Sequence, residues 1–333
     1  MRNVTEPAAT RVERRPVEER NFKGSDPRGR PDTLAQAAQD SLERQWRQAK
    51  SYDRQAVVVG SDLAAPTGTL VMTLQVIDEE GFDFLPGQFV GVAAPRGGTR
   101  RRRSPYCILS AAGDGSFRLL VRVVPEGPLS LQLAELSPGD ALNFRGPTGR
   151  SMLPRETGTD LVLLATGVGV SPLLALANRL LRGGETRQVR LLWGLRMEAD
   201  ICLLPELNEL VAAYPNFSYQ ISLSQPGSGW RGLRGRLGES APAVIGDLQG
   251  KHFYLVGNGE MTSEFAAALR ELGVDETMVY EEAFFHGRLR GDPAAVTALR
   301  TRLLGDAPLS PVIAGETVLF PLEKPLGTAR RAS

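Results

Sequence analysis

The sequence predicts two domains, a small antiparallel β-barrel followed by an α/β domain with a parallel sheet. Short β-rich runs broken by Gly, Pro and Asp fill residues 55–155. Continuous apolar strands then alternate with helical segments through residues 156–290, and a glycine-rich turn joins the first of these strands to its helix. A length of 333 residues suits two domains plus terminal extensions.

The barrel is predicted from closely spaced strand patterns, which are typical of small all-β domains. Turn signals rich in Gly, Pro and Asp lie at 137–140 and 146–149. The β-rich runs are 56–59, 70–76, 88–92 and 117–124.

The second domain is predicted from buried strands that alternate with helices, which indicates a parallel sheet covered on both faces. The predicted strands are 161–165, 189–193, 219–223, 253–256 and 278–280. The predicted helices are 173–181, 203–213 and 263–272.

Two extensions flank these domains. Residues 1–54 begin with a charged, Pro- and Gly-rich stretch that is typical of disorder, followed by a polar helix at 33–50. Residues 291–333 contain a short helix near 293–304 and then an extended segment. The first 30 residues have no apolar core, so we expect no secretory signal and a cytoplasmic location. The apolar run 161–181 is interrupted in its middle by glycines and a proline, which favours strand–loop–helix over a membrane span.

Composition excludes several classes of function. The net charge is +1, so bulk charge indicates neither a nucleic-acid partner nor an anionic membrane. The chain has only two cysteines, Cys107 and Cys202, whereas an iron–sulfur cluster needs about four ligands. The two histidines, His252 and His286, are far apart in the sequence, and we expect no metal site.

Two turns of the α/β domain could bind a nucleotide. The segment 166–172 (Thr-Gly-Val-Gly-Val-Ser-Pro) follows a strand and opens a helix, where glycine lets backbone N–H groups approach a pyrophosphate. The segment 257–261 (Gly-Asn-Gly-Glu-Met) lies at a second strand–helix junction of the same sheet. Either segment alone could be an ordinary βα turn, but two at one sheet edge favour a nucleotide site.

The barrel carries candidates for a second ligand. Arginines 100–103 precede a strand that contains Tyr106, and could form a solvated edge or a phosphate site. Tyr106 could be a half-buried strand aromatic or offer its ring to a flat heterocycle. The segment 127–130 (Gly-Pro-Leu-Ser) places small residues before a helical run, where a phosphate could bind.

In this order, these segments resemble the ferredoxin–NADP reductase superfamily over residues 56–285. The resemblance implies that Tyr106 stacks on a flavin, that Cys107 lies nearest flavin N5, and that Glu282 is the late glutamate of the family. Cys107 and Glu282 are the expected catalytic residues. The expected cofactor-binding residues are Arg103, Ser104, Tyr106, Cys107, Val121, Gly127, Pro128, Leu129, Ser130, Thr166, Gly167, Gly169, Ser171, Pro172, Ser224, Gln225, Arg231, Gly257, Asn258, Gly259, Met261 and Phe284.

The chain departs from the family pattern at several positions. Ser104 stands where the family has its phosphate-binding Arg, and Cys107 replaces Ser or Thr. Val256 replaces a frequent Cys before the second turn. Ser224-Gln225 stands where NADP-specific relatives often have Ser-Arg, although Arg231, Arg234 and Arg236 follow. The choice between NADH and NADPH therefore stays open.

The resemblance implies a flavin-dependent oxidoreductase that passes hydride from NAD(P)H to bound FAD, which is favoured over FMN. The electrons would then go to a separate acceptor such as ferredoxin or flavodoxin. Two alternatives remain: reduction of a small acceptor (quinone, ferric chelate or free flavin), and an electron-transfer or regulatory subunit that docks to a larger complex through its extensions.

Overall fold

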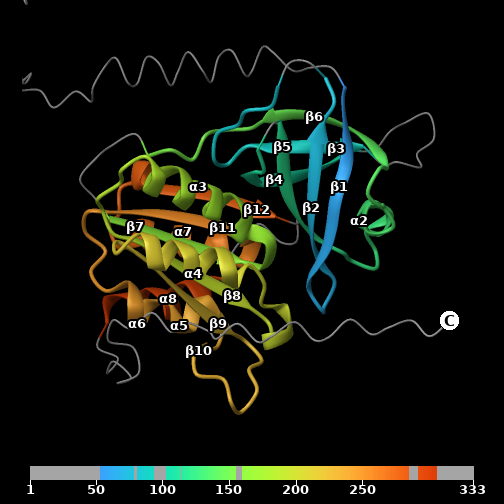
Figure 1. The fold of residues 1–333 in the computed structure, drawn as a ribbon. Coiled ribbons are helices and arrows are strands. Elements are labelled where there is room, and N and C mark those ends of the chain that lie inside the picture. Colours follow the sequence, from blue (N-terminus) through green and yellow to red (C-terminus); the bar gives the residue numbers. More distant parts are fainter. Residues whose placement is uncertain are drawn as a thin grey trace, which may run out of the picture.

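The computed structural model describes residues 53–78, 81–93, 103–113, 115–154, 160–284 and 292–305. A β-barrel and an α/β unit lie beside each other (Figure 1). The helix predicted at 33–50, arginines 100–102, His286 and the extended segment after residue 305 lie outside the described residues. No helix in the described ranges combines the length and the apolar character that a membrane crossing needs.

The barrel is closed and antiparallel, with strand order β1-β2-β5-β4-β3-β6. Apolar side chains, among them Ile108, Phe117 and Phe144, fill its interior. A short helix, α2 (Pro128–Ala134), connects the fifth strand of the chain to the sixth. The strands are β1 (Arg54–Ala65), β2 (Thr69–Val76), β3 (Phe89–Ala93), β4 (Arg103–Ala111), β5 (Ser116–Arg122) and β6 (Ala141–Thr148).

Strand β6 differs from the sequence expectation, which placed only turn signals in this region. Leu142 and Phe144 alternate into the barrel core, and this burial defines a strand. The segment predicted as a turn at 146–149 is instead partly the end of β6, because Gly146 and Pro147 continue it to Thr148.

The α/β unit is a six-stranded parallel sheet of order β10-β9-β8-β7-β11-β12. Its strands are β7 (Asp160–Thr166), β8 (Val189–Leu195), β9 (Phe217–Leu223), β10 (Leu233–Arg234), β11 (Lys251–Asn258) and β12 (Val279–Phe284). The α-helices are α3 (Val170–Arg182), α4 (Leu204–Ala213), α5 (Leu237–Ser240), α6 (Pro242–Ile245), α7 (Gly259–Glu271) and α8 (Pro293–Leu304). Short 3₁₀ turns are η1 (Gly167–Gly169), η2 (Glu198–Asp200) and η3 (Glu276–Met278).

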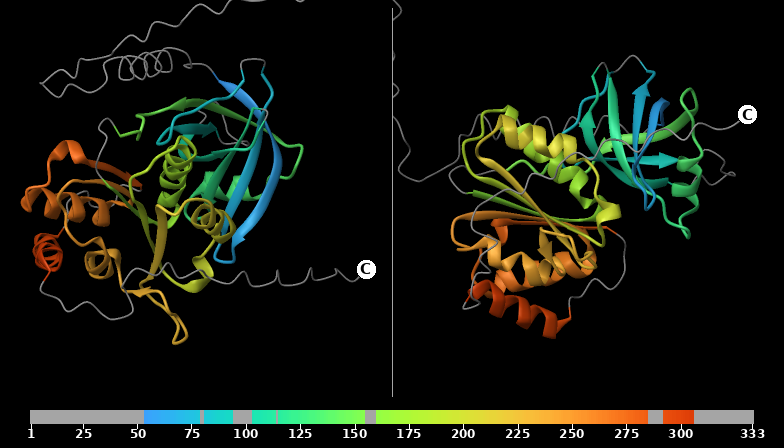
Figure 2. Two further views of the ribbon diagram at one scale, coloured as in Figure 1. Left: turned by 60° about the vertical axis from the view of Figure 1, so that its left-hand side comes forward. Right: turned by 60° about the horizontal axis from the view of Figure 1, so that its bottom comes forward.

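Figure 2 shows α3 and α4 on one face of the sheet and α5–α8 on the other, which confirms the predicted two-sided arrangement. Helix α7 begins four residues earlier than predicted, because the Asn258 side chain accepts the N–H of Glu260 at 2.8 Å and caps it. Elements β10, α5 and α6 were not predicted, since two to four residues are too short to show a period.

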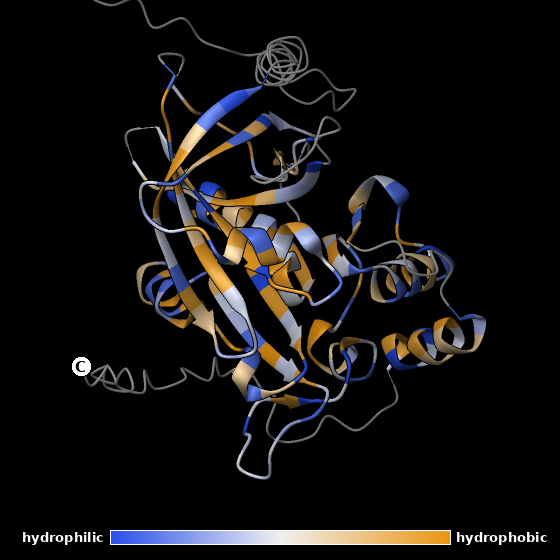
Figure 3. Cartoon of the chain, turned by 90° about the vertical axis from the view of Figure 1, so that its right-hand side faces the viewer, coloured by the Kyte–Doolittle hydropathy of each residue, from blue (hydrophilic) through white to orange (hydrophobic). Residues whose placement is uncertain are grey.

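One apolar cluster spans the barrel and the sheet. Leu109 and Leu120 of the barrel belong to the same buried cluster as Leu173 of α3 and Trp193 of β8. Figure 3 shows hydrophobic residues concentrated along the strands and on the inner sides of the helices. Because buried apolar surface continues across the junction, the two units are held in one orientation.

Candidate active site

Two glycine-containing turns follow the adjacent parallel strands β7 and β11. The hydroxyl of Thr166 accepts the backbone N–H of Asn258 at 2.7 Å, which links them directly. A Cβ on Gly169 would lie 2.5 Å from the carbonyl oxygen of Val256, and one on Gly257, whose φ is +139°, would overlap the Thr166 hydroxyl. Glycine is therefore needed at both positions so that the turns can touch.

A hydrogen bond from the side chain of Trp193 holds the first turn in place. The indole Nε1–H of Trp193, at the end of β8, donates to the carbonyl oxygen of Gly167 at 2.9 Å. Gly167 has a φ of +54° and open space where a Cβ would stand. With this carbonyl held by Trp193, the open side of the turn faces a cavity.

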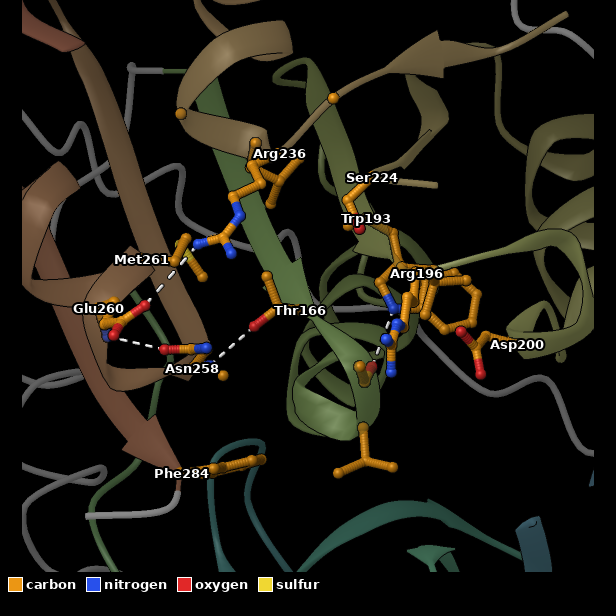
Figure 4. Close-up of a pocket in the computed structure, with 18 of the residues that line it drawn as sticks. Thr166, Trp193, Arg196, Asp200, Ser224, Arg236, Asn258, Glu260, Met261 and Phe284 are labelled. Atoms are coloured by element: carbon orange, nitrogen blue, oxygen red, sulfur yellow. Dashed lines mark hydrogen bonds and ion pairs between the residues drawn. The ribbon is translucent and has the colours of Figure 1, made fainter. Parts of the chain in front are cut away.

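The cavity has a volume of about 850 Å³, within the usual range for ligand pockets. It runs along the carboxyl ends of the sheet strands, where open α/β sheets bind ligands (Figure 4). The structure brings nine of the predicted residues together here: Thr166, Gly167, Ser224, Gln225, Gly257, Asn258, Gly259, Met261 and Phe284.

Arginines line opposite sides of this cavity. In Figure 4, Arg196 lies on the Ser224 side and Arg236 on the Glu260 side. Arg196 Nε donates to the Gln225 side chain at 3.2 Å. Arg236 pairs with Glu260 at 3.8 Å, and its side chain is 78% exposed. Both guanidinium groups are therefore accessible to an anionic ligand.

Other arginines after Ser224 have different places. Arg231 is not among the residues that line the cavity, although the sequence favoured it. Arg234 donates to the carbonyl oxygens of Gly227, Ser228 and Trp230 and holds the loop between β9 and β10.

Three predicted nucleotide-binding residues do not line the cavity. Gly169, Ser171 and Pro172 are buried. The Ser171 hydroxyl donates to the backbone carbonyl of Cys107 at 3.3 Å, so it connects α3 to β4 of the barrel. Ser171 thus contacts the barrel rather than the cavity.

A polar cluster lies where β4 meets β12. The thiol of Cys107 donates to Oε1 of Glu282 at 3.8 Å, and the hydroxyl of Tyr280 donates to Oε2 at 3.1 Å. Burial raises the pKa of the Glu282 carboxyl above its usual range, and the two hydrogen bonds partly oppose this. Burial together with the Glu282 charge raises the pKa of the Cys107 thiol. The two expected catalytic residues are thus in contact, although 175 positions separate them.

The other candidate residues of β4 are Tyr106, Ser104 and Arg103, and their surroundings differ. Tyr106 is half-buried against the barrel core, and burial raises its pKa to about 12. Ser104 lies opposite Val92 in the β3–β4 register. The guanidinium of Arg103 contacts both carboxylate oxygens of Asp53 at 2.6 Å, so its charge is already paired in this structure.

The turn before α2 is tightly built. The hydroxyl of Ser130 accepts the N–H of Val124 at 3.1 Å and donates to the carbonyl of Gly127 at 2.9 Å. A Cβ on Gly127 would lie 2.5 Å from Cγ2 of Val124 and 2.8 Å from that hydroxyl, so a larger residue must displace these side chains. Pro128 opens the helix, where its missing N–H costs nothing.

Two predicted cofactor-binding residues of the barrel have buried side chains. The side chains of Val121 and Leu129 pack into the barrel core. Both side chains are buried among the apolar residues of the barrel interior. Only their backbone atoms remain for a ligand.

Comparison with known proteins agrees with this arrangement. Residues 57–152 match the oxidoreductase FAD-binding domain model, and residues 163–266 match the oxidoreductase NAD-binding domain model. The barrel and the sheet therefore define a flavin- and nicotinamide-dependent oxidoreductase.

Several characterised proteins are similar over much of their length. Ferredoxin–NADP reductase B of Sorangium cellulosum is 33% identical over 64% of this chain and 90% of its own. The toluate 1,2-dioxygenase electron transfer component of Pseudomonas putida is 28% identical over 65% of this chain and 63% of its own. The crystal structure of a cytochrome P450 reductase of Amycolatopsis is 26% identical, covers 70% of each chain and superposes with a TM-score of 0.62. The chain belongs to the ferredoxin–NADP reductase superfamily, whose cofactors are FAD and NAD(P)H.

The residues present fit both cofactors. The two touching turns leave an open cradle above Gly167 at the start of α3, which suits a pyrophosphate. The Gly127 turn is a second position that a Cβ would fill. The Cys107–Glu282 pair lies where the barrel meets the sheet, between these two regions.

Some site residues were missed by sequence reasoning. Arg196 directly follows β8, so the rule that ligands bind at the carboxyl ends of strands would have found it. Arg122 and Asp200 line the cavity and pair with each other at 3.4 Å across the barrel–sheet junction. Their pairing has no local sequence signal, because tertiary packing alone brings them together.

Proposed function

We propose that this chain takes electrons from NADPH and passes them to a separate redox protein of the ferredoxin or flavodoxin type. The observation that carries the proposal is that Phe284 lines the nucleotide cavity while Glu282, two residues earlier on β12, contacts Cys107 of the flavin-side strand. Bound FAD supplies the chemistry, accepting hydride and releasing electrons.

The protein's own residues would mainly position the two cofactors. The turn at Gly167 and the start of α3 present backbone N–H groups and the positive end of a helix to the pyrophosphate. Phe284 and the Asn258 turn border the cavity. Reaction requires the two rings to approach to about 3–3.5 Å.

The preference for NADPH rests on Arg196 and Arg236. The N–H of Gln225 donates to the Arg196 carbonyl at 2.8 Å, and the N–H of Gly235 donates to the Leu223 carbonyl at 2.8 Å. Both arginines are thereby tied to the end of β9, where Ser224 lies. Arg236 keeps an exposed acidic neighbour, Glu260, but exposed pairs are weak and yield to a phosphate.

The coenzyme proposal is tested by replacing each arginine with glutamine. Charged hydrogen bonds are worth about 1.5–3 kcal/mol, so Arg196→Gln and Arg236→Gln should each raise the KM for NADPH roughly 10- to 100-fold and leave the KM for NADH nearly unchanged. Arg231→Gln is the matched control and should change neither. An equal loss with both coenzymes, or none with NADPH, would refute the assignment.

The separate acceptor is supported by cysteine content and by the relatives. Cys107 and Cys202 are the only cysteines of the sequence, too few for a cluster of its own. Similar proteins are named as an electron transfer component of toluate 1,2-dioxygenase and as an NADH-cytochrome b5 reductase of Yarrowia lipolytica.

The decisive experiment is anaerobic titration of the purified flavoprotein with NADPH, followed by turnover with ferredoxin and with a ferric chelate. We expect the flavin absorbance to bleach and the ferredoxin to be reduced catalytically. Turnover of the chelate alone would favour a small acceptor. A protein that binds no flavin, before or after addition of FAD, would contradict the proposal.

A further inference from the structure

Tyr280 is a half-buried tyrosine whose hydroxyl donates to the carboxyl group expected to act next to the flavin. Strand alternation places Tyr280 and Glu282 on the same face of β12. The Tyr280 hydroxyl donates to Oε2 of Glu282 at 3.1 Å, while Oε1 faces the Cys107 thiol at 3.8 Å. The carboxyl group is thus held at both of its oxygens by donors from two different strands.

We propose that Tyr280 is a positioning residue for Glu282: its hydroxyl fixes one carboxyl oxygen and so directs the other toward Cys107. The relevance of this contact to electron transfer rests on the proposed function, whereas the contact itself does not. Without the hydroxyl, the carboxyl could rotate about its last torsion, which is broad for glutamate.

The Tyr280 ring is itself held firmly. It stacks on the ring of Tyr254 of β11 with centroids 5.9 Å apart and an interplanar angle of 28°. The guanidinium of Arg150 lies 5.9 Å from the ring centroid. Both contacts use the ring and not the hydroxyl, so a phenylalanine at position 280 keeps them.

The pKa of the Glu282 carboxyl depends on the groups that surround it. Cys107 from β4 and Tyr280 from β12 contact the carboxyl directly, and Tyr254 from β11 and Arg150 face it only through the Tyr280 ring. Burial raises the pKa of Glu282, and the hydrogen bond from Tyr280 lowers it. Loss of that hydroxyl must therefore raise the pKa further.

The test is the pKa of Glu282 in Tyr280→Phe, measured on the full chain with its flavin bound. The carboxyl carbon is followed by ¹³C NMR and assigned by its absence in Glu282→Gln. The net value of one hydrogen bond predicts an upward shift of about 0.4–1 pH unit. The pH profile of flavin reduction by NADPH should shift in the same direction.

Tyr254→Phe is the matched control, because it removes a hydroxyl from the stacked neighbour and leaves the Glu282 contacts intact. It should not change the pKa of Glu282. A Tyr280→Phe variant that is folded and shows no shift, or an equal shift in Tyr254→Phe, would overturn the proposal. The same titration performed without FAD distinguishes this outcome from failure of the proposed function, which would appear as absence of flavin binding or reduction.

Discussion

The contact between the two glycine-containing turns after β7 and β11 can be tested by adding one methyl group at Gly169. Gly169 has right-handed helical angles (φ −61°, ψ −13°), so alanine meets no conformational penalty there. Its Cβ would, however, lie 2.5 Å from the Val256 carbonyl oxygen and 2.9 Å from Gly257 Cα. These separations are about 1 Å shorter than an optimal contact, so the turns must move apart.

Overpacking of this kind costs about 1–3 kcal/mol, which for a chain of this size lowers Tm by roughly 2–12 °C. Displacement of the turns by part of an ångström should also raise the KM for NADPH at least tenfold. The assays are thermal unfolding and steady-state reduction of a dye acceptor.

The control for Gly169→Ala is Gly229→Ala in the loop between β9 and β10. There a Cβ meets nothing within 4 Å and the residue does not line the cavity, so we expect almost no change. A Gly169→Ala protein that melts and binds NADPH like the wild type would refute the argument that the turns are in contact.

Three further predictions concern single contacts. Trp193→Phe removes the donor to the Gly167 carbonyl, so the free energy of unfolding should fall by about 1–3 kcal/mol and the KM for NADPH should rise, as measured by denaturant unfolding and kinetics. Gly127→Ala crowds the Ser130 hydroxyl and should lower the flavin-to-protein absorbance ratio after gel filtration, whereas full retention would contradict a flavin site there. Arg187 holds the pKa of Glu185 below its ordinary 4.5, so this pair stabilises the fold above that pH and the stability is lost as the pH falls through the lowered pKa. Unfolding curves of wild type and Glu185→Gln should therefore converge as the pH is lowered, and parallel curves would disprove it.

The fold class was predictable because its periodic patterns are local. The strand β7 and the helix α3 each carry a continuous apolar pattern, and the structure confirms them within a few residues. Strand β6 was missed because Gly146 and Pro147 have the composition of a turn, and only closure of the barrel makes them strand. Tertiary pairing thus overrode local propensity at that point.

The sequence predicted the parts of the site that depend on backbone conformation. It did not predict the contacts between side chains of the barrel and side chains of the α/β unit. The touching turns at Gly169 and Gly257 follow from the strand–turn–helix pattern and the parallel sheet. Ser171 carries the expected motif, but whether its hydroxyl faces the cavity or the barrel depends on how α3 packs on β4. Successive side chains of a helix point about 100° apart, so a rotation of α3 by one residue would turn Ser171 to another side. A sequence motif alone does not determine that rotation.

The packing of α3 against β4 explains how the two cofactor sites keep a fixed relation. Helix α3 opens at the nucleotide turn, and its Ser171 bonds to the backbone of Cys107, the residue that contacts Glu282. Leu109, two positions further along β4, is buried in the same cluster as Leu173 of α3. Because protein interiors are close-packed, a displacement of the nucleotide turn must be transmitted to the strand that carries Cys107. In the proposed function α3 would hold the nucleotide and β4 would contact the flavin, so this shared core would set the distance between the two rings.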